Sequence, residues 1–190
     1  MIVKFMIVIT MGEVTNMHFI GITKAEDNFC EFGFSDAYIT MEKDFDTALK
    51  NAYEKYAKMD GIENITVMTI THNTDFSSLF NLVDDTEAFI NCAKQIARHC
   101  EWSPLFMDEH NAYLVVEKSN DGVVGGEFIV ARTKPEALEE FTDGYLYRRE
   151  GEAHKVTPQS LVKKLSEVTF YNTYNILAEA LVYLQLKEGV

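Results

Sequence analysis

The sequence has few cysteines, few prolines and no long apolar run, and each shortage argues against a class of protein. Cys30, Cys92 and Cys100 are the only cysteines among 190 residues, which is too few for a disulfide framework. Free thiols are typical of a reducing compartment, so we expect a cytoplasmic protein. Three prolines, ten glycines and the lack of a low-complexity segment argue against disorder. No stretch approaches the ~20 apolar residues of a membrane span, so we expect no membrane partner.

Basic residues are also scarce, and this shortage is the strongest functional signal. Seventeen Lys and Arg face thirty Asp and Glu, which gives a formal charge of −13. Such a chain is not expected to bind nucleic acid directly, but it can bind a protein with a basic surface. Acidic residues are concentrated in 26–63, with ten acidic and four basic residues, and in 101–152, with twelve and five.

The charge distribution suggests an acidic protein-binding module. Its sharpest form is an inhibitor of the phage or mobile-element type, which copies the charge of nucleic acid and blocks a nucleic-acid-binding protein. An ordinary solvated surface that keeps the protein soluble is the competing interpretation. Under the inhibitor hypothesis the partner-binding residues are Glu26, Asp27, Glu31, Asp36, Asp44 and Asp46.

Recognisable catalytic and cofactor motifs are missing, so the residues favour a protein without enzymatic activity. The alternative is a small-molecule-binding protein or enzyme with its site in the loop that contains His72, Asn73 and Asp75, because ligand sites gather at the carboxyl ends of strands. His72 and Asp75 could pair as base and orienter. The same residue types also form turns unaided.

Metal and phosphate motifs are equally weak. Cys92, His99, Cys100 and His110 do not have the spacing of a zinc site. The glycines near Gly122 are not followed by the Lys and Ser or Thr of a phosphate-binding loop. We therefore expect no metal and no cofactor.

Alternation of apolar residues and turn signals predict several strands. Residues 1–10 are apolar on both faces and lack the basic start of a signal peptide, so we expect a buried strand there. Asp121-Gly122 between two apolar segments predicts a hairpin. The expected strands are 1–10, 17–23, 29–34, 37–41, 65–71, 113–118 and 123–132.

Helical periodicity and capping signals predict four helices. One begins after Asp44 and ends before Gly61, and another begins at Asp84 or Asp85. A short helix covers 134–141, and Thr157-Pro158 opens the last one. Its two apolar stripes are out of phase, which predicts a break within 169–173.

The end of the last helix is apolar nearly all round, so it is either deeply buried or covered by a partner. We expect Leu177, Leu181 and Leu184 to form a homodimer interface. A structural or assembly protein that dimerises through this helix is therefore a third functional hypothesis.

The element pattern predicts the fold class. Strands and helices of this order indicate an α+β protein with a mixed, mostly antiparallel sheet, helices packed against it and a long C-terminal helical segment. No internal repeat or linker is evident in the sequence, so we expect one domain over residues 1–190.

Overall fold

The computed structural model describes residues 15–25, 33–119, 122–143 and 150–188, and it confirms the α+β class. Two sets of elements follow each other with the same order, strand–strand–helix–strand–helix–helix–strand. The first set is β1 (Asn16–Lys24), β2 (Asp36–Glu42), α1 (Phe45–Tyr56), β3 (Ile62–Thr69), α2 (Phe76–Phe80), α3 (Thr86–Ala97) and β4 (Cys100–Trp102). The second set is β5 (Asn111–Ser119), β6 (Gly122–Ala131), α5 (Lys134–Asp143), β7 (Gly151–Val156), α6 (Pro158–Lys164), α7 (Phe170–Leu181) and β8 (Leu184–Leu186).

The two halves also share their sheet topology. The strand order is β2-β1-β3 in one sheet and β6-β5-β7 in the other, with every neighbouring pair antiparallel. The expectation that the chain has no internal repeat was therefore wrong. The repeat escapes notice because few side chains are shared and only their apolar or polar character recurs.

An approximate two-fold axis relates the halves and passes through the ribbon formed by β4 and β8. Cys100 pairs with Leu186 and Trp102 with Leu184, while Glu101 faces Gln185 at the centre. Exchanging the two halves maps this pairing onto itself. Helix α4 (Pro104–Met107) connects the halves, and a 3₁₀ turn (Leu165–Glu167) continues α6.

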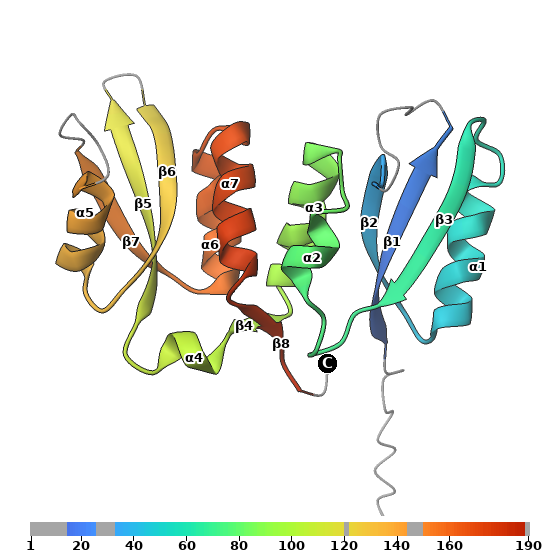
Figure 1. Ribbon diagram of the computed structural model, residues 1–190, viewed down its shortest axis with the longest axis horizontal. Helices are drawn as coiled ribbons and strands as arrows, with labels where there is room; N and C mark the ends of the chain where they lie inside the picture. Colours follow the sequence, from blue (N-terminus) through green and yellow to red (C-terminus); the bar gives the residue numbers. More distant parts are fainter. Residues whose placement is uncertain (1–14, 26–32, 120–121, 144–149, 189–190) are drawn as a thin grey trace, which may run out of the picture.

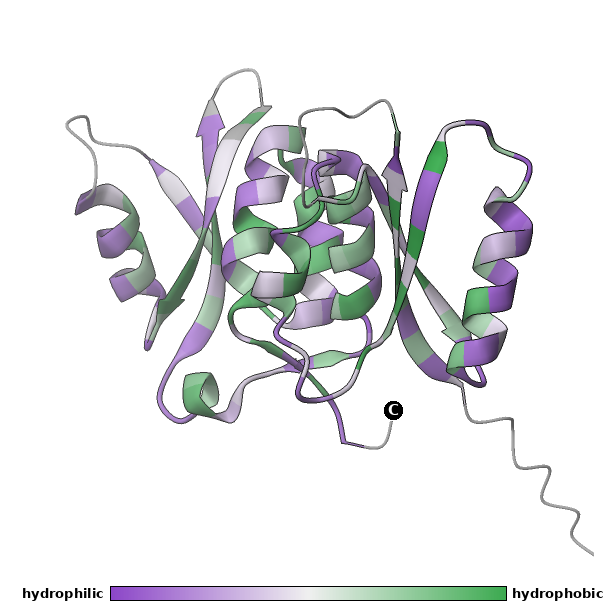
Figure 2. Cartoon of the chain, turned by 45° about the vertical axis from the view of Figure 1, so that its right-hand side comes forward, coloured by the Kyte–Doolittle hydropathy of each residue, from purple (hydrophilic) through white to green (hydrophobic). Residues whose placement is uncertain are grey.

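The elements form layers, as Figure 1 shows. Helices α2, α3, α6 and α7 lie between the two three-stranded sheets, and α1 and α5 cover the outer faces of the sheets. Strand alternation explains the arrangement. In β1, Met17 and Phe19 belong to the central core, whereas Ile20 and Ile22 pack under α1. Figure 2 shows the hydrophobic residues concentrated on the central helices.

Both outer helices begin with the same capping geometry. Asp44 accepts a hydrogen bond from the N–H of Thr47 (2.7 Å), and Thr133 accepts one from the N–H of Glu136 (3.3 Å). Asn16 and Asn111, the first residues of β1 and β5, donate to the carbonyls of Lys43 and Arg132 just before these caps. The caps fix the position of each outer helix against its sheet.

Several expected boundaries are confirmed. Asp44 caps α1, Gly61 after that helix has φ +82°, and Asp85 caps α3. The last helical segment is interrupted before α7, which begins after Thr169. Of the expected strands, 1–10 and most of 29–34 lie outside the described residues.

Candidate protein-binding groove

A groove of about 670 Å³ lies where α4, α5 and α7 meet the edge strand β6. It is built by elements that are far apart in the sequence. Because β6 is the outer strand of its sheet, the groove reaches an edge that no other strand covers within the described part of the chain. The lining residues that matter below are Leu105, Phe106, Phe128, Glu140, Glu179 and Val182.

Four aromatic rings form the floor of the groove and its support. Trp102 contacts Phe106 and Phe128 with centroid distances of 5.3 and 5.5 Å. The ring of Tyr183 contacts the same two phenylalanines, with centroid distances of 5.3 Å to Phe106 and 6.0 Å to Phe128. Tilted aromatic contacts at these distances are favourable. The cluster gives the groove a rigid apolar base.

Apolar side chains at the rim remain in water. Leu105 on α4 is 91% exposed and Val182 at the end of α7 is 62% exposed, and both line the groove. Tyr183 and Phe106 add aromatic surface between them. Single exposed apolar residues are common, but several around one apolar hollow are typical of an interaction site.

The groove carries negative charge on both sides of β6. Glu179 of α7 accepts a hydrogen bond from the backbone N–H of Phe128. Its pKa is raised, mainly by desolvation and also by the nearby charge of Glu127, while the Phe128 hydrogen bond acts in the opposite direction. Glu140 of α5 lines the groove from the outer face of the sheet. A cationic group would relieve the repulsion among these carboxylates.

The equivalent surface in the first half has different chemistry. Helices α3 and α7 each have twelve residues, so Gln95 and Arg98 of the first half correspond to Glu179 and Val182. Arg98 and Val182 are the C-cap residues of their helices. The first half thus has an amide and a cation where the second has a carboxylate and an apolar side chain.

The predicted acidic surface is only partly described. Glu26, Asp27 and Glu31 lie outside the described residues. Asp36 begins β2, whereas Asp44 and Asp46 lie beyond its other end, at the start of α1. Seven strand residues separate the two groups by ~20 Å. A single dense carboxylate ridge is therefore not evident among the described members, and the partner-binding role of this surface stays a prediction.

In the loop after β3, only one of the three alternative site residues lines the adjacent pocket. Asp75 is the N-cap of α2 and accepts hydrogen bonds from the hydroxyl (2.6 Å) and N–H (3.1 Å) of Ser78. These hydrogen bonds lower the pKa of Asp75. His72 and Asn73 are exposed, and a pocket of about 300 Å³ beside Asp75 includes neither of them in its lining. The Asp75 carboxylate thus has a structural role.

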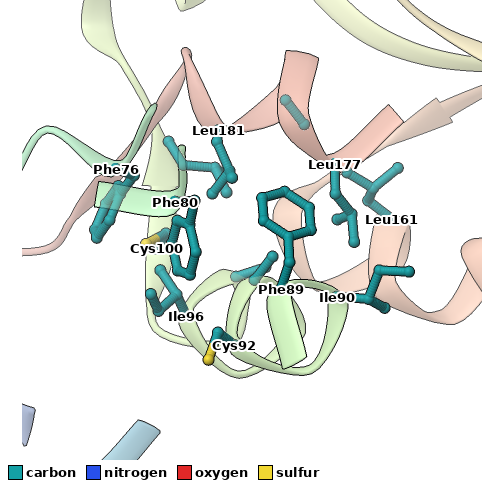
Figure 3. Packing of buried hydrophobic residues seen from close by; sticks show 14 of the residues in the cluster. Phe76, Phe80, Phe89, Ile90, Cys92, Ile96, Cys100, Leu161, Leu177 and Leu181 are labelled. Carbon is teal, nitrogen blue, oxygen red and sulfur yellow. The ribbon is translucent and has the colours of Figure 1, made fainter. Parts of the chain in front are cut away.

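The apolar face of α7 is covered by the same chain. Leu177, Leu181 and Leu184 are buried in the central core, where Figure 3 shows Leu177 and Leu181 across from Phe89 and Phe80 of the first half. Contacts within one chain account for the apolar helix without a second copy. The homodimer stays a prediction with no structural support from these residues.

The thiols of Cys92 and Cys100 belong to the same core. Burial raises the pKa of each to about 12, so both are protonated at neutral pH and act as small apolar side chains. Within the described residues, no three His, Cys, Asp or Glu side chains are grouped as a metal site requires.

The sequence singles out several residues of the groove, but it does not show that they come together beside β6. Trp102, Pro104 and Phe106 stand out as aromatic and turn residues in an irregular connector. Their position beside β6 depends on the pairing of β4 with β8, which no local pattern reveals.

Comparisons with known proteins identify no family model, no curated protein and no solved structure that matches this chain. Within the described ranges, no helix is long and apolar enough to span a bilayer.

Proposed function

We propose that this chain is a protein-binding module and that an extended segment of a partner protein binds in the β6 groove. The observation that supports the proposal is the pair of exposed apolar residues, Leu105 and Val182, above an aromatic floor. Burying such side chains against a partner is favourable by roughly 25 cal/mol per Å² of apolar surface. The carboxylates of the groove complement a basic segment.

An inhibitor that mimics nucleic acid is a narrower form of the protein-binding hypothesis and uses a different surface. It assigns the contact to Asp36, Asp44 and Asp46 together with the acidic residues of 26–31, rather than to the groove. The negative charge of −13 supports a basic partner in either case. One experiment can decide which of the two surfaces binds the partner.

The test is capture of partners by the tagged full-length chain from nuclease-treated lysate, with three variants in parallel. Leu105→Asp/Val182→Arg places charge at the groove, and Tyr53→Asp/Met59→Arg makes the matched change on exposed apolar residues near α1. Asp36→Lys/Asp46→Lys reverses two charges of the acidic surface and leaves the Asp44 cap of α1 intact.

We expect a stoichiometric partner that binds the wild type and the α1 control but not the groove variant. Loss of binding only with the double lysine variant would transfer the interface to the acidic surface. Equal binding of every captured protein by wild type and groove variant would contradict the proposal.

A further inference from the structure

The groove combines a strand edge, an apolar surface and two flanking carboxylates, and these features together define a ligand class. Since the N–H of Phe128 reaches Glu179 on α7, the peptide group of Phe128 points away from β5. Alternate residues of a strand direct their peptide groups to the same side, so Val130 presents its N–H and carbonyl at this edge as well. An extended chain laid along β6 can therefore pair with backbone groups.

The carboxylates approach this edge from both faces of the sheet. Glu140 comes from the outer helix α5, and Glu179 comes from the central helix α7. A side chain that projects from a bound strand toward either face meets one of them, because successive side chains of a strand alternate in direction. A Lys or Arg at such a position would form a charge-assisted hydrogen bond with the exposed carboxylate that it meets.

We propose that the groove selects an extended segment in which two consecutive Lys or Arg, which point to opposite faces, are flanked by apolar residues, and that this segment adds to β6 as a further strand. The inference rests on the proposed function and names its ligand class. Leu105, Val182 and Phe106 contact the apolar side chains of the segment, and Glu140 and Glu179 bind its cations. Glu179 exchanges its hydrogen bond to Phe128 for the incoming backbone and cation.

The first half provides an internal comparison. Asn51 and Gln95 occupy the positions of Glu140 and Glu179, and Arg98 replaces Val182. Asn51 also donates a hydrogen bond to Glu42 at the end of β2. An arginine and two amides disfavour a cationic segment, so only one of the two related edges is suited to it.

Binding of short labelled peptides to the full-length chain, followed by fluorescence anisotropy, tests the proposal. The probes are a peptide with two consecutive lysines between valines, its counterpart with glutamine in place of lysine, and the lysine peptide N-methylated at alternate residues. We expect the lysine peptide to bind about tenfold more tightly than the glutamine peptide, as two partly exposed ion pairs allow. The N-methylated peptide should lose binding, because methylation removes the donors that pair with β6.

Charge removal in the protein gives the second measurement. Glu140→Gln/Glu179→Gln should weaken the lysine peptide about tenfold and leave the glutamine peptide unchanged. Glu63→Gln/Glu139→Gln removes the same net charge from exposed positions outside the groove lining and should have little effect. Amide shifts on binding should be centred on Phe128 and Val130.

The outcomes separate this inference from the proposed function. If lysine and glutamine peptides bind equally and Leu105→Asp/Val182→Arg abolishes both, the groove is a binding site but charge selection is wrong. If the N-methylated peptide binds as well as its parent, strand addition is wrong. If no peptide binds, the ligand class is wrong, and the capture experiment alone decides the proposed function.

Discussion

The two halves of the molecule have the same topology but differ at the edge of each sheet. Their shared features are the ones that fold requires: antiparallel pairing, alternation of apolar residues, caps at Asp44 and Thr133, and an alanine of each outer helix against its sheet, Ala48 or Ala137. Their differences, Gln95 against Glu179 and Arg98 against Val182, lie where the fold needs nothing specific. Residues free to vary between related halves are candidates for function.

A second difference concerns how each half fills the same space. Register places Gly21 of β1 where β5 has Val116. A Cβ at Gly21 would lie 2.6 Å from the ring of Phe34, which follows the long β1–β2 connection and bonds to Leu82 and Asp84. In the second half, only two residues separate β5 from β6, and the buried side chain of Val116 fills the position. The first half thus fills this space with the ring of Phe34 from outside the strand, whereas the second half fills it with the side chain of the strand residue itself.

Breaking the shared core should have the largest effect. Phe19 and Leu114 hold equivalent positions in β1 and β5, and both are fully buried in the central core. Phe19→Ala should cost about 3–5 kcal/mol of the free energy of unfolding and Leu114→Ala about 2–5 kcal/mol. Denaturant unfolding measures both.

Unfolding of these variants also tests whether the halves are independent. Because the central core joins them, tryptophan fluorescence from the single Trp102 and far-UV circular dichroism should give coincident transitions. Two separated transitions in Phe19→Ala would show that the halves unfold separately.

Replacing the glycine and ring of the first half by the valine of the second should have an intermediate effect on stability. Gly21→Val collides with Phe34 and should cost about 1–3 kcal/mol as overpacking. Phe34→Ala alone leaves a cavity beside Phe19, whose ring centroid is 5.5 Å away. The double variant should lose less stability than the sum, because the valine fills part of that cavity, as Val116 does in the second half. Additive losses in a double-mutant cycle would contradict this equivalence.

The N-cap residues of α1 and α5 should give the stability of the two halves a different dependence on pH. The hydroxyl and N–H of Thr47 hold the pKa of Asp44 below its ordinary value. The stabilisation by Asp44 is therefore present above the ordinary aspartate pKa and is lost as pH falls through the lowered folded value. Asp44→Ala should reduce the Tm at neutral pH and have little effect at strongly acidic pH.

Thr133 provides the matched comparison, because its hydroxyl cap does not titrate. Thr133→Ala should cost about 1 kcal/mol at neutral and acidic pH alike. A loss of similar size for Asp44→Ala at both pH values would mean that the charge of Asp44 is irrelevant to its cap.

Local elements could be predicted from the sequence because their causes are local. Asp44, Asp85 and Thr157 begin helices through short-range hydrogen bonds, and the structure confirms each. Gly61 has the expected left-handed backbone, but α1 already ends at Tyr56. The spacing of apolar residues predicts that Phe45, Leu49, Ala52, Tyr56 and Met59 form the buried face of this helix, which is partly wrong, since Phe45 and Met59 are exposed and Ala48 is buried. That helix packs with small residues against β1, and periodicity alone favours large ones.

The duplication and the groove could not be predicted because both depend on contacts across long sequence distances. Register in the β4–β8 ribbon joins residues near 101 and 185, and Glu140 reaches the groove from a helix that the sequence does not place relative to the sheet. The acidic composition indicated a basic partner but not which surface of the chain binds it. The candidate site follows only when the sheets and helices are placed together.

The smallest effect on stability should accompany the largest effect on binding. Val182→Arg and Arg98→Val exchange two helix C-cap residues that correspond between the halves and are both exposed. Each should change the free energy of unfolding by less than about 0.5 kcal/mol. Only Val182→Arg should abolish partner binding, because it alone places a cation at the groove. If Arg98→Val reduced binding equally, the β2 edge would also be an interface, and the difference between the halves would have no functional meaning.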